Sequence, residues 1–442
     1  MTSGDSRPTN VRFLVVGITA LAAMWMYIDR VCFSTLSKAV GEDLQIAEDE
    51  MSWVLGLFFF TYALFQIPIG SLADRFGPRI VLTVAIAAWS VCTAATAFAG
   101  GVASLIAVRL ALGACEAGAY PAAAGLVRRW ASAAERGRLS SAVAFGGRIG
   151  GALAPILTAA IAVAVAIPGV WGFVSADRAN WRMVFLLYGA CGLIVAVAFW
   201  VFVRDTPAQH PRANAAEAAR AAGPAPVTAA TVPWFRRLHA LATSPNMWLF
   251  GATQFLVNVS WIFLITRLPK YLDEVFHVDL DDVGRMQSVP LIASCIGMAC
   301  GGWFADAMHG RLGPRWGRTV PISLVLFVCA AAYIVATMMS SAWGVIALLS
   351  VMAFFVDLGV PSIWAFAQDV GGRQVGAALG WGHMWGNFGA MLSPVVVFAI
   401  RDRYGWDVVF YTCAGSFVLA GLAALNLNAT VPVLAEDRDR SR

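Results

Sequence analysis

Charged residues are scarce in this sequence, because Asp, Glu, Lys and Arg together make up 13% of its 442 residues. A soluble domain carries about 25% charged residues, so this composition excludes an ordinary soluble globular protein. The GxxxxGK[ST], HExxH and GxSxG signatures are absent, which removes the main sequence evidence for an ATP-driven protein, a zinc protease or a serine hydrolase. No basic block alternates with aromatic residues, so a nucleic-acid partner is not expected.

The eight cysteines and five histidines give no sign of a disulfide framework or a metal site. Every cysteine lies within an apolar stretch, no CxxC pair occurs, and the histidines are not spaced as ligands. Buried cysteines of this kind behave as small hydrophobic residues. We therefore expect no metal, no cofactor and no enzyme activity.

Long apolar runs dominate the chain, with 59% hydrophobic residues and a mean hydropathy of +0.71. A helix needs about 20 apolar residues to cross a bilayer, and windows of that length recur about twelve times. The sequence therefore predicts an all-α membrane protein with twelve transmembrane helices in two six-helix halves. The predicted spans are 12–35, 51–72, 80–99, 103–126, 139–166, 182–203, 246–268, 286–307, 319–338, 342–366, 376–400 and 407–427.

Arginine-rich loops follow the even-numbered spans, whereas the opposite loops are acidic or neutral, with RDRYGWD near residue 401 as a mild exception. By the positive-inside rule, the arginine-rich loops and both termini face the cytoplasm. No small-residue cleavage site follows the first span. This span is therefore predicted to be a retained helix rather than a signal peptide.

One long polar interval, rich in Ala and Pro, follows the sixth span. It divides the chain into an N-terminal half at 1–204, a cytoplasmic linker at 205–245 and a C-terminal half at 246–442. The halves share two sequence echoes in the same order: GSLADRFGPR returns as GWFADAMHGRLGPR, and WRMVF returns as WDVVF. Such an internal duplication in a membrane protein favours alternating access around a site near the bilayer midplane.

Four charged side chains are predicted at membrane depth in the first half. Asp29 and Arg30 are adjacent, and Arg109 and Glu116 are two helical turns apart on one face of the fourth span. Each such charge costs roughly 2.5 to 3.5 kcal/mol, so its default interpretation is functional. Asp29 and Arg30 point about 100° apart and need not pair with each other. The alternative is a set of ion pairs that only hold helices together.

The loop GSLADRFGPR resembles the motif between the second and third helices of major facilitator superfamily transporters. Its matching residues, with one from the repeated loop, are Gly70, Asp74, Arg75, Gly77, Arg79 and Asp306. The resemblance implies that these residues form a gate, and solvated turns are the alternative. Five further motifs are similar to the anion:cation symporter branch, which includes hexuronate, galactonate and glucarate transporters and the vesicular glutamate and sialic acid carriers. They are YxDR at 27–30, YALFQIPIG at 62–70, RLALGACEAG at 109–118, WxxxxERG at 130–137 and DTPAQHP at 205–211.

The resemblance, which covers nearly the whole chain, also implies roles for single residues. Family members carry protons on an aspartate at the place of Asp29 and on a glutamate at the place of Glu116. The family arginine at the place of Arg30 binds the substrate carboxylate. Three further positions match residues that contact substrate or line its pocket: Tyr62, Trp364 and Asn387. For Tyr62, an aromatic core residue is the alternative.

Two positions depart from the family pattern. His383 stands where sugar-acid members usually have asparagine, and it can bind substrate, titrate or simply fill the core. Arg148 lies at or next to a position where galactonate-type members carry glutamine. With Arg30 and Arg109 it makes three cations available, so a substrate with more negative charge than a monocarboxylate is a further hypothesis. Asp357 in the tenth span has no family role.

These observations predict a proton-coupled secondary symporter for small organic anions, with sugar acids such as hexuronates or aldonates as the first choice. The expected location is a bacterial inner membrane, and the expected partners are the anion, protons and the lipid bilayer, with the protein as a monomer. Two alternatives stay open. One is a carrier for dicarboxylates or aromatic acids, and the other is a receptor that binds the anion without moving it.

Overall fold

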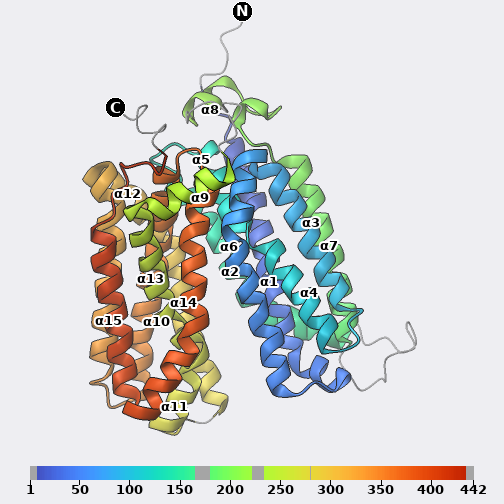
Figure 1. Ribbon diagram of the computed structural model, residues 1–442, viewed down its shortest axis with the longest axis vertical. Helices are drawn as coiled ribbons and strands as arrows, with labels where there is room; N and C mark the ends of the chain where they lie inside the picture. Colours follow the sequence, from blue (N-terminus) through green and yellow to red (C-terminus); the bar gives the residue numbers. More distant parts are fainter. Residues whose placement is uncertain (1–6, 165–179, 222–232, 279, 435–442) are drawn as a thin grey trace, which may run out of the picture. The chain divides into compact units, whose positions relative to one another are not determined.

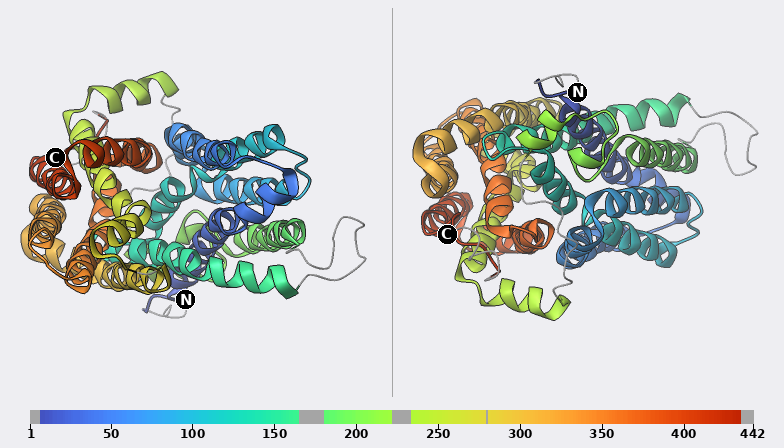
Figure 2. Two further views of the ribbon diagram at one scale, coloured as in Figure 1. Left: turned by 90° about the horizontal axis from the view of Figure 1, so that it is seen from below. Right: turned by 90° about the horizontal axis from the view of Figure 1, so that it is seen from above.

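The computed structural model describes residues 7–164, 180–221, 233–278 and 280–434, and most of these residues form long helices joined by short turns (Figure 1). The chain divides into two compact units. Unit 1 holds Met1–Trp130 and Val143–Ala222, and unit 2 holds Ala131–Ala142 and Gly223–Arg442. Seen end-on, the helices of each unit pack side by side as a bundle (Figure 2).

Unit 1 contains the first seven long helices and a short capping segment. Its elements are α1 (Val11–Leu44), α2 (Glu48–Phe76), α3 (Pro78–Thr96), α4 (Val102–Glu116), α5 (Ala119–Trp130), most of α6 (Arg136–Ala164), α7 (Trp181–Phe202), the 3-10 turn η1 (Pro207–Gln209) and α8 (Ala215–Arg220). Unit 2 adds α9 (Trp234–Thr243), α10 (Pro245–Thr266), α11 (Leu268–Phe276), α12 (Leu280–Ala336), α13 (Ala342–Gly371), α14 (Val375–Tyr404) and α15 (Trp406–Leu425).

In the described residues, eleven helical segments are long and apolar enough to cross a membrane. One of them, Arg285–Ala336 within α12, covers the two predicted spans 286–307 and 319–338. Gly313 inside α12 takes a positive φ of 76°, where the chain leaves helical geometry. A Cβ built on Gly317 would lie 2.5 Å from Cα of His309, so the chain doubles back at this point. The prediction of an all-α membrane protein with twelve spanning helices is confirmed.

The predicted span 103–126 is not one regular helix. α4 ends at Glu116 and α5 begins at Ala119. At the junction, a Cβ on Gly118 would overlap the side chain of Ile69, so the missing side chain lets α2 approach closely. Glu116 therefore lies at a helix end, next to a break in the regular backbone.

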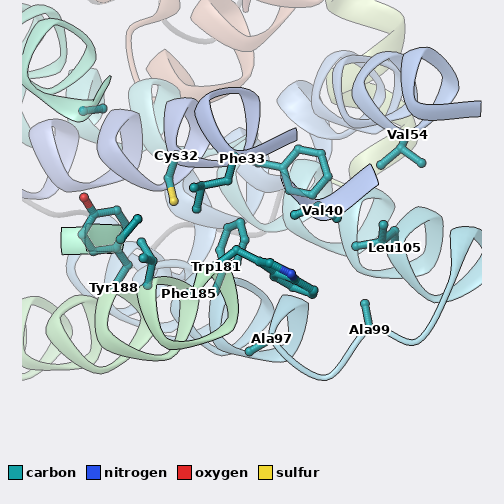
Figure 3. Packing of buried hydrophobic residues seen from close by; sticks show 14 of the residues in the cluster. Cys32, Phe33, Val40, Val54, Ala97, Ala99, Leu105, Trp181, Phe185 and Tyr188 are labelled. Carbon is teal, nitrogen blue, oxygen red and sulfur yellow. The ribbon is translucent and has the colours of Figure 1, made fainter. Parts of the chain in front are cut away.

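The core of unit 1 is a cluster of apolar side chains from α1, α2, α4, α6 and α7 and from the turn after α3 (Figure 3). Phe33 packs on Phe185 with ring centroids 6.0 Å apart, and Trp181 packs edge-on against Phe185 at the same distance. In Figure 3 these rings lie between the α1 and α7 ribbons, beside Cys32. Close packing of side chains is the main attraction between helices within a bilayer, so this cluster holds α1 against α7.

Acidic residues after α7 close the N-terminal ends of two helices in unit 1. Asp205 accepts a 2.9 Å hydrogen bond from the backbone N–H of Arg79 at the start of α3. Glu217 accepts backbone N–H groups of Asn10 at 3.0 Å and Arg12 at 3.3 Å, and its carboxylate also binds the Arg12 guanidinium at 2.9 Å. Carboxylates at helix N-termini satisfy free N–H groups and complement the helix dipole.

Candidate substrate and coupling site

Arg30 of α1 and Glu116 of α4 form a buried ion pair inside unit 1. Nε and Nη2 of Arg30 both donate to Oε2 of Glu116, over 3.0 and 2.8 Å. The Glu116 side chain is 0% exposed and the Arg30 side chain 13%. Oε1 of Glu116 has no hydrogen-bond partner among the described residues. Arg30 therefore already binds a carboxylate here, through only one of its two oxygens.

Three aromatic rings surround the same guanidinium. Cζ of Arg30 lies 4.4 Å from the ring centroid of Tyr62, 4.9 Å from that of Tyr27 and 5.1 Å from that of Phe58. Aromatic faces attract a cation electrostatically, so these rings hold the guanidinium in position. Tyr27 and Phe58 were not among the predicted site residues. Tyr27 lies three residues before Arg30 on α1, and Phe58 lies four residues before Tyr62 on α2, so each shares a helix face with a predicted site residue. This spacing is the sequence feature that could have identified them.

Arg109 lies close to the Arg30–Glu116 pair, but in the described residues no hydrogen bond joins it to Glu116. Its Cζ lies 4.5 Å from the Phe33 ring centroid and 4.6 Å from that of Phe58. The residue is 2% exposed, and its Nε and Nη1 have no hydrogen-bond partner among the described residues. The shared helix face inferred from the seven-residue spacing therefore brings Arg109 and Glu116 into electrostatic reach, while the hydrogen bonds of Glu116 go to Arg30.

Asp29 is buried and does not take part in the Arg30–Glu116 ion pair. It is 1% exposed, and neither carboxylate oxygen has a hydrogen-bond partner in the described parts of the chain. Thr93 of α3 is its polar neighbour, but the two side chains do not reach hydrogen-bond geometry. Glu116 acts on Asp29 through space. Unit 1 thus holds two interacting carboxyl groups, of which only one is bound to an arginine.

Arg148 of α6 lies within electrostatic reach of Tyr120. The rings of Tyr27 and Tyr120 are 6.2 Å apart, and Arg148 and Arg30 both interact electrostatically with Tyr120. Gly147 makes room for this arrangement, because a Cβ there would lie 3.0 Å from two ring carbons of Tyr27. Tyr120 was missed in the sequence, where it only precedes a proline in an alanine-rich stretch. Arg148 and Arg30 therefore border one tyrosine-lined region of unit 1.

In unit 2, the predicted residues Trp364 and His383 lie together. Their ring centroids are 6.4 Å apart, with Trp364 on α13 and His383 on α14. Asn387 lies one turn further along α14 and donates its side-chain N–H to the backbone oxygen of His383 at 2.7 Å. Asp357 is fully buried on α13 and accepts a hydrogen bond from the Ser294 hydroxyl of α12.

The predicted loop residues occupy two equivalent glycine turns. Gly77 has a φ of 93° and is followed by Pro78, the first residue of α3, while Gly313 has a φ of 76° and is followed by Pro314. Arg79 donates its backbone N–H to Asp205, and its guanidinium lies 3.9 Å from the Trp200 ring centroid. The predicted loop also includes Gly70, Asp74 and Arg75, which lie in the last two turns of α2.

Asp306 of unit 2 closes the N-terminal end of α6. It accepts the backbone N–H of Gly137 at 2.8 Å and of Arg138 at 3.1 Å, and it also binds the Arg138 guanidinium at 3.1 Å. Close by in the same unit, Asp369 binds both Arg136 and Arg318, the latter at 2.8 Å. These contacts involve the segment Ala131–Ala142, which belongs to unit 2.

The family model described as Major Facilitator Superfamily matches residues 19–394. The chain belongs to the major facilitator superfamily. Members of this superfamily are membrane transporters, not enzymes. A probable sulfoacetate transporter of Cupriavidus necator is 31% identical over 437 residues, covering 96% of both chains. The hexuronate transporter of Bacillus subtilis is 27% identical and covers 91% of this chain and 89% of its own.

Solved structures agree with the superfamily fold. A human organic anion transporter superposes with a TM-score of 0.68, at 17% identity and covering 95% of this chain and 100% of its own. At 17% identity this similarity supports the fold of the chain and says nothing about its substrate. It agrees with the helix order described above.

Proposed function

We propose that this superfamily member is a proton-coupled symporter of small organic anions that works by alternating access. Sugar acids such as hexuronates or aldonates are the preferred substrate class, and a bacterial inner membrane with cytoplasmic termini is the location. The hexuronate transporter that matches over most of its length supports this substrate class. One observation carries the coupling proposal: Arg30 holds Glu116 through the donors that a substrate carboxylate would use.

Glu116 and the substrate compete for one guanidinium in this proposal. Ionised Glu116 occupies Nε and Nη2 of Arg30. A proton on Glu116 removes the competing negative charge, and the planar guanidinium can then bind a substrate carboxylate with two parallel hydrogen bonds. Loss of the proton lets Glu116 displace the anion again. Proton and anion therefore travel together, and Asp29 is the second proposed proton carrier.

The remaining predicted residues take supporting roles in the proposal. Substrate contacts beyond Arg30 are assigned to Tyr62, Arg109, Arg148, Trp364, His383 and Asn387. The loop residues Gly70, Asp74, Arg75, Gly77, Arg79 and Asp306 are assigned to the equilibrium between the transport states, to which a ligand contributes only by binding one state more tightly.

A second candidate is a carrier for small dianions. The 31% identical relative is named for sulfoacetate, which carries a sulfonate as well as a carboxylate. Arg148 supplies a further cation, which interacts electrostatically with Tyr120, as Arg30 does. One acidic group on Arg30 and the other on Arg148 would use both cations.

Uptake into proteoliposomes with an imposed pH gradient tests the function. A panel of hexuronates, aldonates, short dicarboxylates and sulfonated acids separates the two candidates. We expect accumulation of at least one hydroxylated acid, accompanied by proton entry. Binding without accumulation would contradict symport and favour a receptor.

A further inference from the structure

Gln66 of α2 is a buried amide that makes no hydrogen bond within the described part of the chain. It is 0% exposed, and neither Oε1 nor Nε2 has a hydrogen-bond partner among the described residues. A buried polar group without a partner is costly, whereas methionine of similar size would bury there without this penalty. Packing in this structure therefore does not explain why a glutamine, and not an apolar residue, occupies position 66.

The position of Gln66 on its helix connects it with the Arg30 site. Phe58, Tyr62 and Gln66 follow each other at intervals of four residues, so they form one line along one face of α2. The first two of these side chains contact the guanidinium of Arg30. Gln66 lies one turn beyond Tyr62, about 6 Å further along the helix axis.

The contacts of two other α2 residues, Phe58 and Ile69, show what packs next to this face. A Cβ on Gly113 would lie 3.2 Å from the backbone carbon of Phe58, and a Cβ on Gly118 would overlap Ile69. Both glycines belong to the α4–α5 segment that carries Glu116. Gln66 thus lies next to the surface of α2 that packs on the α4–α5 segment.

We propose that Gln66 is a specificity-determining residue, which binds a hydroxyl group of a hydroxylated organic acid whose carboxylate is held by Arg30. This inference rests on the proposed symport of organic anions. An amide offers both an acceptor and donors, which matches a hydroxyl group, while it brings no charge for a second acidic group. One helical turn of separation suits a short polyhydroxylated acid. Gln66 then favours sugar acids over dianions that lack hydroxyl groups.

The test compares binding of hexuronates and aldonates with binding of their singly deoxygenated analogues, for wild type and Gln66→Met. For wild type, loss of the recognised hydroxyl should weaken binding by about tenfold, or ~1.4 kcal/mol. Gln66→Met should bind the two acids within about twofold of each other. Gln66→Asn, which keeps a shorter amide, should retain part of the preference. A full wild-type preference in Gln66→Met would overturn the proposal.

Gln374 provides the matched control in unit 2. It is 2% exposed, its amide atoms also lack hydrogen-bond partners in the described residues, and it lies at the start of α14. Gln374→Met should leave the preference for the hydroxyl group unchanged. Both methionine variants should raise the apparent Tm, so a lower Tm for Gln66→Met alone would show a structural role and overturn the proposal.

The two levels of the hypothesis fail differently. If wild type binds no hydroxylated acid but transports other organic anions, the inference about Gln66 is overturned while anion symport stands. If wild type discriminates the hydroxyl and Gln66→Met does so equally, only the role of Gln66 is lost. If no organic anion is bound at all, the proposed function falls as well.

Discussion

The two units repeat their framework but not their chemistry. In unit 1 the indole of Trp181, at the start of α7, donates to Asp43 at 3.2 Å, and Arg182 binds the same carboxylate. In unit 2 the indole of Trp406, at the start of α15, donates to Glu274 at 2.9 Å, which also binds Arg401. The glycine–proline turns repeat in the same way. Both sequence echoes therefore mark structural contacts that connect consecutive helices. We call these contacts, together with the glycine–proline turns, the repeated joints.

Inside the spans the units differ. Unit 1 carries Asp29, Arg30, Arg109, Glu116 and Arg148 away from the span ends, whereas the described part of unit 2 carries Asp357 and His383 there. The charged residues within the spans are concentrated in unit 1, although both units share the same framework. This indicates that the features common to both units support the fold. The difference between the copies then serves substrate and proton binding, so variants of unit 1 charges should act on binding and coupling, and variants of the repeated joints on stability.

The largest effect is expected for Arg30→Ala. Removing one partner of a dry charged contact costs about 2 to 5 kcal/mol, or roughly 30- to several-thousand-fold in Kd. Arg30→Lys should fall between wild type and Arg30→Ala, because a lysine has no planar fork of donors. His383→Ala in unit 2 is the comparison and should cost less than Arg30→Ala. The measurement is calorimetric binding with detergent-purified, monodisperse protein.

An Arg30→Ala protein that binds its anion within about threefold of wild type, or under about 0.7 kcal/mol, would place the anchor elsewhere. Arg109 and Arg148 would then become the candidates. The asymmetry between the units would survive this result, but the competition between Glu116 and substrate would not.

Glu116→Gln should abolish accumulation driven by a pH gradient while leaving counterflow exchange partly intact. Glutamine resembles the protonated acid, so Arg30 stays available to substrate but no proton is exchanged. Uptake and counterflow are measured in the same proteoliposomes. Undiminished accumulation against a gradient by this variant would remove Glu116 from coupling.

Arg148→Gln should weaken binding of dianions by about tenfold and of monoanions by less than about threefold, since only the dianion has a second acidic group for this cation. Matched mono- and dicarboxylates of equal length provide the comparison. Equal losses for both acids would point to a structural role for Arg148 beside Tyr120.

The sequence predicts the spans well but not every end or pairing. The first span is predicted at 12–35, whereas α1 continues to Leu44. Polar residues such as Lys38 can extend a helix beyond its apolar stretch, so an apolar window does not show where the helix ends. Arg30 and Glu116 could be named as functional residues from their depth. Their direct contact could not be derived, because it depends on how α1 and α4 are rotated toward each other. Spacing within one helix pointed instead to Arg109.

The smallest effects are expected at the repeated joints. Asp43→Asn and Glu274→Gln should each lower the apparent Tm slightly and leave substrate Kd within about twofold, since ion pairs near the surface contribute little to stability. Hydrogen bonds from Arg401 hold the pKa of Glu274 below its ordinary value. The stabilisation is therefore present at neutral pH and lost as pH falls through that lowered pKa.

Thermal unfolding at several pH values checks this prediction. The Tm difference between wild type and Glu274→Gln should shrink below the ordinary glutamate pKa of about 4.3. A large change in Kd for either joint variant would contradict the separation between framework and chemistry.

Proton uptake on substrate binding tests the central claim most directly, namely that a proton on Glu116 frees Arg30 for the anion. Binding calorimetry in buffers of different ionisation enthalpy counts the protons taken up by detergent-purified protein at neutral pH. The account predicts net proton uptake when wild type binds its anion, and a clearly smaller uptake for Glu116→Gln, which still binds. Equal uptake by the two proteins would contradict it.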